Sequence, residues 1–119
     1  MERVICVTGG RNYADREAVF RALDSLNDPI IDWVVHGFAK GADSLAREWA
    51  ISRGVNHKGY PADWRVHGPK AGPLRNKQML KESNPTLLVW FPGGPGTKNC
   101  VATAERMGIL VLRGDTLDI

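Results

Sequence analysis

Residues 86–97 read TLLVWFPGGPGT, which joins the clearest strand signal in the chain to its sharpest glycine-rich loop. The apolar run from Thr86 to Phe91 is typical of a strand that is covered on both faces of a sheet. The loop from Pro92 to Thr97 leads into a helical pattern that we place from about Thr97 to Met107, ending at Gly108. This order predicts a strand followed by a helix, as in a β-α-β unit.

The same alternation of strand and helix extends over the rest of the chain. The predicted strands are Arg3–Thr8, Trp33–His36, a weaker one at Val55–Tyr60, Thr86–Phe91 and Ile109–Leu112. The predicted helices are Asp15–Leu26, one that opens at Gly41-Ala42-Asp43 and is capped by Gly54, a short one from Pro73 to about Glu82, and Thr97–Met107 with Val101, Ala104 and Met107 inward. The segment from Pro61 to Pro73 contains three prolines and two glycines and is predicted as a long loop. We therefore expect a doubly wound parallel sheet of about five strands.

Composition limits the number of domains and the class of partner. A chain of 119 residues with 43% hydrophobic residues can bury one core, so we expect a single Rossmann-like α/β domain over residues 1–119. Sixteen Lys and Arg against thirteen Asp and Glu fit an anionic ligand, without the dense basic blocks of a nucleic-acid-binding tail.

Cysteine, histidine and apolar content point to a reduced cytoplasmic location. Cys6 and Cys100 are far apart in sequence and have no metal-ligand spacing, and the three histidines show none either. The longest apolar run is too short to span a bilayer. We therefore propose no metal, no cofactor and no membrane insertion.

Three strands of the predicted sheet are followed by unusual loops. Because ligands bind beyond the carboxyl ends of parallel strands, these loops are the candidate site. Glycine lets backbone N–H groups approach a phosphate, and a following helix adds the positive end of its dipole. The candidate ligand-binding residues are Gly9, Gly10, Arg11, Asn12 and Tyr13 after the first strand; Gly37, Lys40, Gly41, Ala42 and Asp43 after the second; Arg75; and Pro92, Gly93, Gly94, Gly96 and Thr97 after the fourth.

None of the loops matches the Walker motif or the full dinucleotide-binding fingerprint. For any one loop, glycines that merely form a tight turn are an equally good interpretation. A positive rim of Arg11, Lys40, Arg65, Lys70, Arg75, Lys77 and Lys98 would attract an anion. Within it, Arg75 is the best single candidate, because a guanidinium can bind phosphate or carboxylate bidentately. Tyr13 and Trp64 are either base-stacking residues or part of the core and its lid.

These residues together resemble a known family. The segments that carry the resemblance are GGRNY at 9–13, HG at 36–37, KGADSLA at 40–46, WA at 49–50, YPADW at 60–64, AGPLRNKQM at 71–79 and FPGGPGT at 91–97. They resemble the YspA/YpsA-related branch of the SLOG superfamily, found in bacteria and phages. That superfamily includes the LOG phosphoribohydrolases, long misnamed lysine decarboxylases, and DNA-processing protein A. The resemblance implies a Rossmann-like nucleotide-binding fold, frequently dimeric.

The resemblance also bears on catalysis. In LOG enzymes a catalytic glutamate stands at the position of Cys100, whereas Arg75 and Met79 fit the arginine and methionine of those enzymes. A thiol is a poor substitute for a carboxylate beside a cationic sugar-like transition state. Asp43 can supply a carboxylate, but a helix cap or a hydrogen-bond acceptor for ribose are non-catalytic roles that we favour for it. Arg75 and Asp43 are the only catalytic candidates.

Three functions remain open from the sequence. The leading hypothesis is a module that senses, sequesters or presents a phosphate-containing nucleotide or nucleotide derivative. The alternative is phosphoribohydrolase-like hydrolysis of the N-glycosidic bond of a nucleoside monophosphate. Single-stranded nucleic-acid binding ranks third. We also expect a homodimer or higher homo-oligomer.

Overall fold

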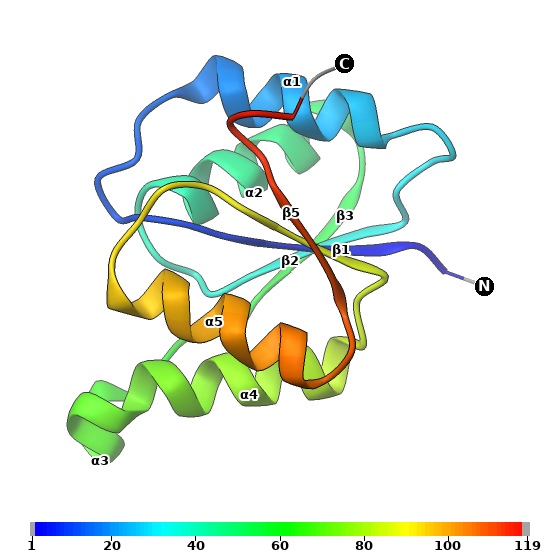
Figure 1. The fold of residues 1–119 in the computed structure, drawn as a ribbon. Helices are drawn as coiled ribbons and strands as arrows, with labels where there is room; N and C mark the ends of the chain where they lie inside the picture. Colours follow the sequence, from blue (N-terminus) through cyan, green and yellow to red (C-terminus); the bar gives the residue numbers. More distant parts are fainter. Residues whose placement is uncertain (1, 118–119) are drawn as a thin grey trace.

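Within residues 2–117, five strands alternate with helices and pair in one parallel sheet (Figure 1). The computed structural model describes residues 2–117. The strands are β1 (Val4–Thr8), β2 (Trp33–His36), β3 (Asn56–Gly59), β4 (Leu87–Trp90) and β5 (Leu110–Arg113). The helices are α1 (Arg16–Leu26), α2 (Ala42–Arg53), α3 (Trp64–His67), the 3₁₀ turn η1 (Gly68–Lys70), α4 (Ala71–Ser83) and α5 (Pro95–Arg106). The predicted fold class is confirmed, since the sheet order is β3-β2-β1-β4-β5.

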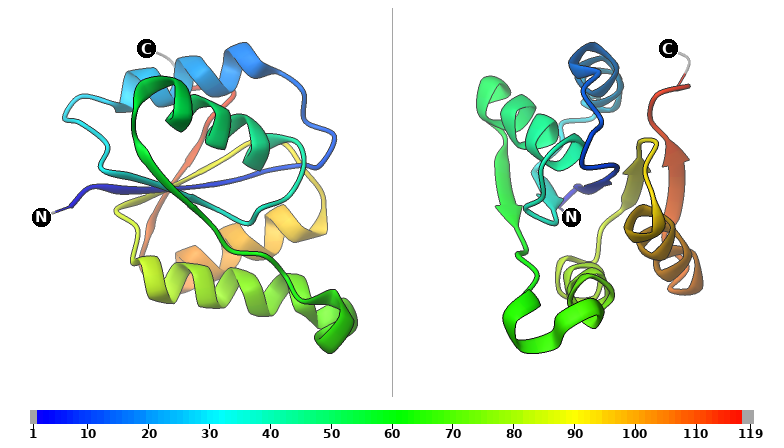
Figure 2. Two further views of the ribbon diagram at one scale, coloured as in Figure 1. Left: turned by 180° about the vertical axis from the view of Figure 1, so that it is seen from behind. Right: turned by 90° about the vertical axis from the view of Figure 1, so that its left-hand side faces the viewer.

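Side chains of the central strand β1 pack against helices on both faces of the sheet. Ile5 and Val7 pack into the cluster that includes α1 and α2, whereas Cys6 packs with residues of α4 and α5 on the other face. Figures 1 and 2 show these two layers on opposite sides of the sheet. A strand covered on both faces is mostly apolar, as residues Val4 to Val7 of β1 are.

The sheet reverses its winding between β1 and β4. From β1 the chain proceeds outward through β2 to β3, and it then returns to the other side of β1 to form β4 and β5. In such sheets the crevice at this switch point is the usual ligand site. The carboxyl ends of the strands lie at the left of Figure 1, and the right-hand view of Figure 2 faces them.

Predicted helix ends are confirmed where local chemistry determines them. The Asp15 side chain accepts a hydrogen bond from the backbone N–H of Ala18 at 3.1 Å and caps α1. Gly54 ends α2 in the left-handed conformation with φ of 67°, which glycine adopts without strain. No helix within residues 2–117 has the length and apolar character needed to cross a membrane.

The prediction of a long loop from Pro61 to Pro73 is wrong. This segment contains α3 and η1, and α4 begins at Ala71. The Asp63 side chain accepts from the N–H of Val66 at 3.2 Å and so caps α3. Pro69 and Pro73 lie in the first turns of η1 and α4, where the missing N–H has no cost, so they do not break these helices. Pro61 lies before α3.

Met107 was also wrongly placed on the inner face of the last helix. Its side chain is 43% exposed, while Ala104 is buried as predicted. The reason is that α5 ends at Arg106, and Met107 turns the chain toward β5 as the C-cap residue. The helical period therefore no longer determines the direction of its side chain.

Candidate functional site

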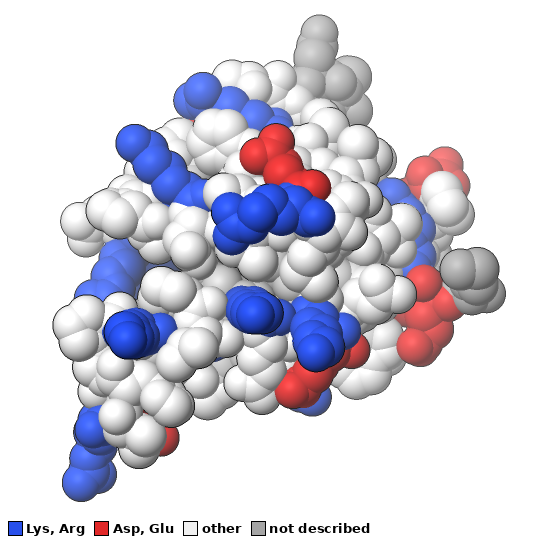
Figure 3. Space-filling view, turned by 60° about the horizontal axis from the view of Figure 1, so that its bottom comes forward, with Lys and Arg blue, Asp and Glu red and all other residues white. Residues whose placement is uncertain are grey.

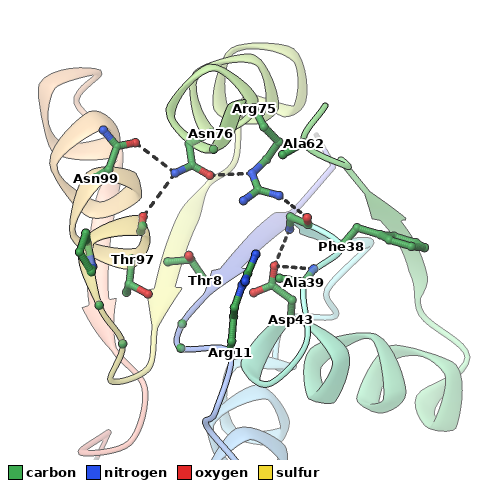
Figure 4. Close-up of a pocket in the computed structure, with 18 of the residues that line it drawn as sticks. Thr8, Arg11, Phe38, Ala39, Asp43, Ala62, Arg75, Asn76, Thr97 and Asn99 are labelled. Carbon is green, nitrogen blue, oxygen red and sulfur yellow. Dashed lines mark hydrogen bonds between the residues drawn. The ribbon is translucent and has the colours of Figure 1, made fainter. Parts of the chain in front are cut away.

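A cleft of about 1410 Å³ opens at the carboxyl ends of the strands. It lies among the loops that follow β1, β2 and β4 and the segment from α3 into α4 (Figure 4). The structure brings most of the predicted site residues together there: Gly9, Gly10, Arg11, Asn12, Tyr13, Gly37, Asp43, Arg75, Pro92, Gly93, Gly94, Gly96 and Thr97. Lys40, Gly41 and Ala42 do not line it.

One group of glycines holds the loops against each other. The Gly10 N–H donates to the carbonyl of Pro92 at 3.0 Å, and a Cβ on Gly10 would lie 2.8 Å from that oxygen. A Cβ on Gly93 would lie 2.6 Å from the Gly10 nitrogen. Gly41 has φ of 77° and faces the Gly10 carbonyl, so a side chain is excluded there for two reasons. These three glycines have a packing role that needs no ligand.

Gly94 and Gly96 differ from that group. A Cβ on either would meet nothing within 4 Å, and neither has a positive φ. Gly94 is the N-cap residue of α5 and is followed by Pro95, which has no N–H. No side chain of the described residues caps this helix, so the N–H groups of Gly96 and Thr97 are the first donors at its positive end. The site suits an anion.

Asp43 lies in the first turn of α2 and is only 4% exposed. Its Oδ2 accepts hydrogen bonds from the backbone N–H of Gly37 at 2.8 Å and of Ala39 at 3.4 Å. Burial raises the pKa of this carboxyl to about 6, although those hydrogen bonds and the nearby Arg75 charge act in the opposite direction. The carboxylate therefore organises the loop after β2 rather than capping its own helix.

Arg75 is held by the same loop. Its Nη1 donates to the carbonyl of Gly37 and, at 3.1 Å, to that of Tyr60, while Nε donates to Asn76 Oδ1 at 2.9 Å. A Cβ on Gly37 would lie 2.5 Å from Arg75 Nη1 and 3.0 Å from Asp43 Oδ2. Gly37 thus allows the guanidinium and the carboxylate to approach it from two sides. Figure 4 shows Arg75 and Asp43 on the two sides of this loop.

Sequence reasoning missed a pair of asparagines in the cleft. Asn76 of α4 donates through Nδ2 to the carbonyl of Gly96 at 3.3 Å and to Asn99 Oδ1 at 3.1 Å. This pair ties the start of α4 to that of α5 beside the glycine-rich loop (Figure 4). The available signal was an asparagine in the first two turns of each of two helices that begin at one sheet edge.

Two aromatic residues at the cleft are exposed. Trp64 of α3 is 49% exposed and its ring lies over Gly72, where a Cβ would approach the indole to 3.1 Å. Phe38 is 63% exposed and has φ of 59°, which is uncommon for a bulky residue. Tyr13 instead packs on Phe91, with ring centroids 5.3 Å apart. Of the two predicted stacking candidates, Trp64 has the more open ring.

Cys100 does not line the cleft. It is fully buried in a cluster with Cys6 of β1 and residues of α4. The Cys6 thiol donates to Met79 Sδ at 3.9 Å, and the neighbouring Cys100 side chain together with burial raises the pKa of Cys6 well above its ordinary value. The position that carries the glutamate in LOG enzymes is therefore a core position in this chain.

Fold and site together define a class: a small Rossmann-like α/β domain with a glycine-rich cleft at its topological switch point. A sequence model described as the YspA, cpYpsA-related SLOG family matches residues 3–67, and the chain belongs to that family. The gene 61 protein of Mycobacterium phage D29 is 41% identical over an alignment of 123 residues, which covers 94% of this chain and 95% of that protein.

Two solved structures share the fold at low sequence identity. DNA processing protein A (DprA) from Streptococcus pneumoniae matches 96% of this chain with a TM-score of 0.53 and 15% identity. The UDP-GlcNAc 2-epimerase from Neisseria meningitidis, bound to UDP-GlcNAc, matches 92% with a TM-score of 0.55 and 16% identity. The chain spans 59% of the first structure and 31% of the second. At these identities the likeness concerns the fold alone.

Proposed function

We propose that the chain binds a phosphate-containing nucleotide or nucleotide derivative in this cleft, with a phosphate at the start of α5. The observation that carries this proposal is the pair Gly94 and Gly96, for which neither packing nor backbone conformation requires glycine. Their open surroundings leave room for a ligand to approach the N–H groups of Gly96 and Thr97. The module would sense, sequester or present its ligand.

The charge distribution supports an anionic ligand. Residues 64–106 contain seven Lys and Arg but only two Asp and Glu. Figure 3 shows blue side chains gathered over the face formed by the helices at the bottom of Figure 1. Arg11 extends into the cleft from the loop after β1 (Figure 4). Such a field raises the local concentration of anions near the cleft.

Calorimetry with nucleoside monophosphates, cyclic nucleotides and ADP-ribose-type compounds tests the proposal. We expect at least one saturable ligand, and Gly94→Asp should abolish its binding. An aspartate at this N-cap accepts the α5 N–H groups itself and repels phosphate, while it adds a few tenths of a kcal/mol of stability. Gly94→Ala tests for steric effects, and Gln78→Glu on the exposed side of α4 is the matched charge control. Absence of binding across the panel would refute the proposal.

A second candidate is N-glycosidic hydrolysis of a nucleoside monophosphate, which Asp43 favours. Its carboxyl lines the cleft near Arg75 and has a pKa of about 6, suited to proton transfer or charge stabilisation near neutral pH. We would then expect free base to accumulate with time, and this release to be lost in Arg75→Ala and Asp43→Asn. A flat time course with tight ligand binding rejects hydrolysis and leaves the first proposal intact.

Single-stranded nucleic acid ranks third, supported by the basic face in Figure 3. It requires that oligonucleotide affinity fall steeply with salt, because each phosphate contact releases counterions. The family resemblance also predicts a homodimer or higher homo-oligomer. Light scattering at several protein concentrations measures that property independently of any ligand.

A further inference from the structure

Only one of the two carboxylate oxygens of Asp43 accepts hydrogen bonds within the described protein. Both of its observed hydrogen bonds, from Gly37 and Ala39, end on Oδ2. Within residues 2–117 no donor is bonded to Oδ1, although the residue is 4% exposed and lines the cleft. Among the residues that the structure describes, His36 Nε2 is the only fully buried side-chain nitrogen or oxygen without a partner, so Asp43 Oδ1 is open to the cleft and can accept a hydrogen bond from a ligand. In Figure 4 the second oxygen of Asp43 faces the interior of the cleft.

Loop structure does not explain why this residue is an aspartate. An asparagine would accept the same two N–H bonds without placing a charge in a buried position. The acidic side chain is therefore suited to a group that enters the cleft and donates a proton in a hydrogen bond.

Arg75 offers a hydrogen-bond donor close to the Asp43 carboxylate. Its Nη1 and Nε are bonded to protein oxygens, while no acceptor within the described residues is bonded to Nη2. Gly37 brings this guanidinium and the Asp43 carboxylate close to each other. A group that donates to one and accepts from the other is a hydroxyl. An ionised phosphate cannot donate to Asp43 and is repelled by it, whereas the start of α5 offers backbone donors free of that conflict.

We propose that Asp43 and Arg75 bind a ribose hydroxyl of the ligand, so that the cleft selects ribonucleotides over deoxyribonucleotides. This inference rests on the proposed function and adds a second subsite to it. The phosphate lies at the glycine-rich loop, and the sugar lies against the loop after β2.

The experiment measures the affinities of AMP, GMP, CMP and UMP and of their 2′-deoxy and 3′-deoxy forms. All carry the same 5′-phosphate, so the phosphate subsite is constant across the series. A hydrogen bond to a charged group predicts that removing one of the two hydroxyls weakens binding by about 10- to 100-fold. Asp43→Asn should reduce that ratio to within about threefold, while Asp15→Asn, the same substitution at the cap of α1, should leave it unchanged.

The outcomes separate this inference from the proposed function. If ribonucleotides and both deoxy forms bind wild-type protein equally, the hydroxyl subsite is refuted while nucleotide binding stands. If no member of the series binds, the proposed function is refuted together with this inference. The wild-type ratio needs no variant, so the test holds even if Asp43→Asn fails to fold. Where Asp43→Asn does fold, retention of the full ratio assigns selectivity to other residues and overturns the proposal.

Discussion

The two ends of the cleft are built in different ways. At the start of α5 the surface consists of backbone at Gly94 and Gly96, open and without a buried charge. At the start of α2 it consists of side chains, with the Asp43 carboxylate and the Arg75 guanidinium packed around Gly37. The first end presents donors that a helix leaves unsatisfied in any case. The second end holds a charge that burial disfavours.

This difference predicts opposite consequences for stability. Changes at the open end should affect ligand binding and leave the fold intact. Changes at the charged end should alter the fold as well, and neutralising the carboxylate should stabilise it. Functional sites commonly show such a trade between stability and activity.

The largest effect is expected from placing a carboxylate in the core, at a position of α5 that does not line the cleft. Cys100→Glu gives the chain the residue of the LOG enzymes, but position 100 is fully buried among Cys6 and Met79. We expect a loss of about 3–5 kcal/mol, enough to unfold a marginal domain, and no gain of hydrolysis. Urea denaturation measures the loss, with Cys100→Ala as the control for lost packing. A stable Cys100→Glu protein that releases base would contradict the core assignment of this position.

Arg75→Ala should have the next largest effect. The substitution leaves the carbonyls of Gly37 and Tyr60 without their donor and removes the cation beside Asp43. We expect a loss of about 2–4 kcal/mol in the free energy of unfolding. Lys77→Ala, an exposed change on the same helix, should stay within about 0.5 kcal/mol. Equal effects of the two changes would show that Arg75 does not hold the loop after β2.

Sequence reasoning succeeded where one local signal determines one feature. Short apolar runs separated by helical patterns predicted the five strands. Asp15 and Gly54 marked the start of α1 and the end of α2, because capping acts within one helical turn. Most of the loop residues that line the cleft were predicted, because the carboxyl ends of parallel strands share one edge.

Sequence reasoning failed where the outcome depends on contacts between distant segments. The asparagine pair Asn76 and Asn99 forms only when α4 packs on α5, and an asparagine near the start of each helix does not by itself show that the two side chains meet. The packing glycines Gly10 and Gly93 look the same in sequence as Gly94 and Gly96, although only at the first two would a Cβ clash with neighbouring atoms. The segment after Pro61 was misread because prolines at helix starts resemble prolines in loops.

Asp43→Asn is expected to stabilise the protein at neutral pH. Burial raises the carboxyl pKa from 3.8 to about 6, so the folded state holds this proton more tightly than the unfolded state does. Ionisation above pH 6 therefore costs stability, and that cost disappears as the pH falls from 6 toward 4. At about 1.4 kcal/mol per pKa unit, the gain in Asp43→Asn is on the order of 1–3 kcal/mol at pH 7.5. Thermal melts at pH 7.5 and 4.5 should show a gain that shrinks at the lower pH. A variant less stable than wild type at pH 7.5 would mean that the charge itself supports the fold.

The smallest expected effects come from alanine substitutions at the neighbouring glycines Gly93 and Gly94. They test directly whether the start of α5 is open surface that the fold does not require. In Gly93→Ala the new Cβ would lie 2.6 Å from the Gly10 nitrogen and 2.9 Å from its Cα, and backbone cannot move aside as a flexible side chain can. Such overpacking costs about 1–3 kcal/mol. In Gly94→Ala nothing lies within 4 Å, and only the weaker N-capping of alanine remains, at less than about 1 kcal/mol. Urea denaturation of the two variants in parallel measures the difference. Equal losses would show that Gly94 is required by the fold, and the argument that it is kept open for a ligand would fail.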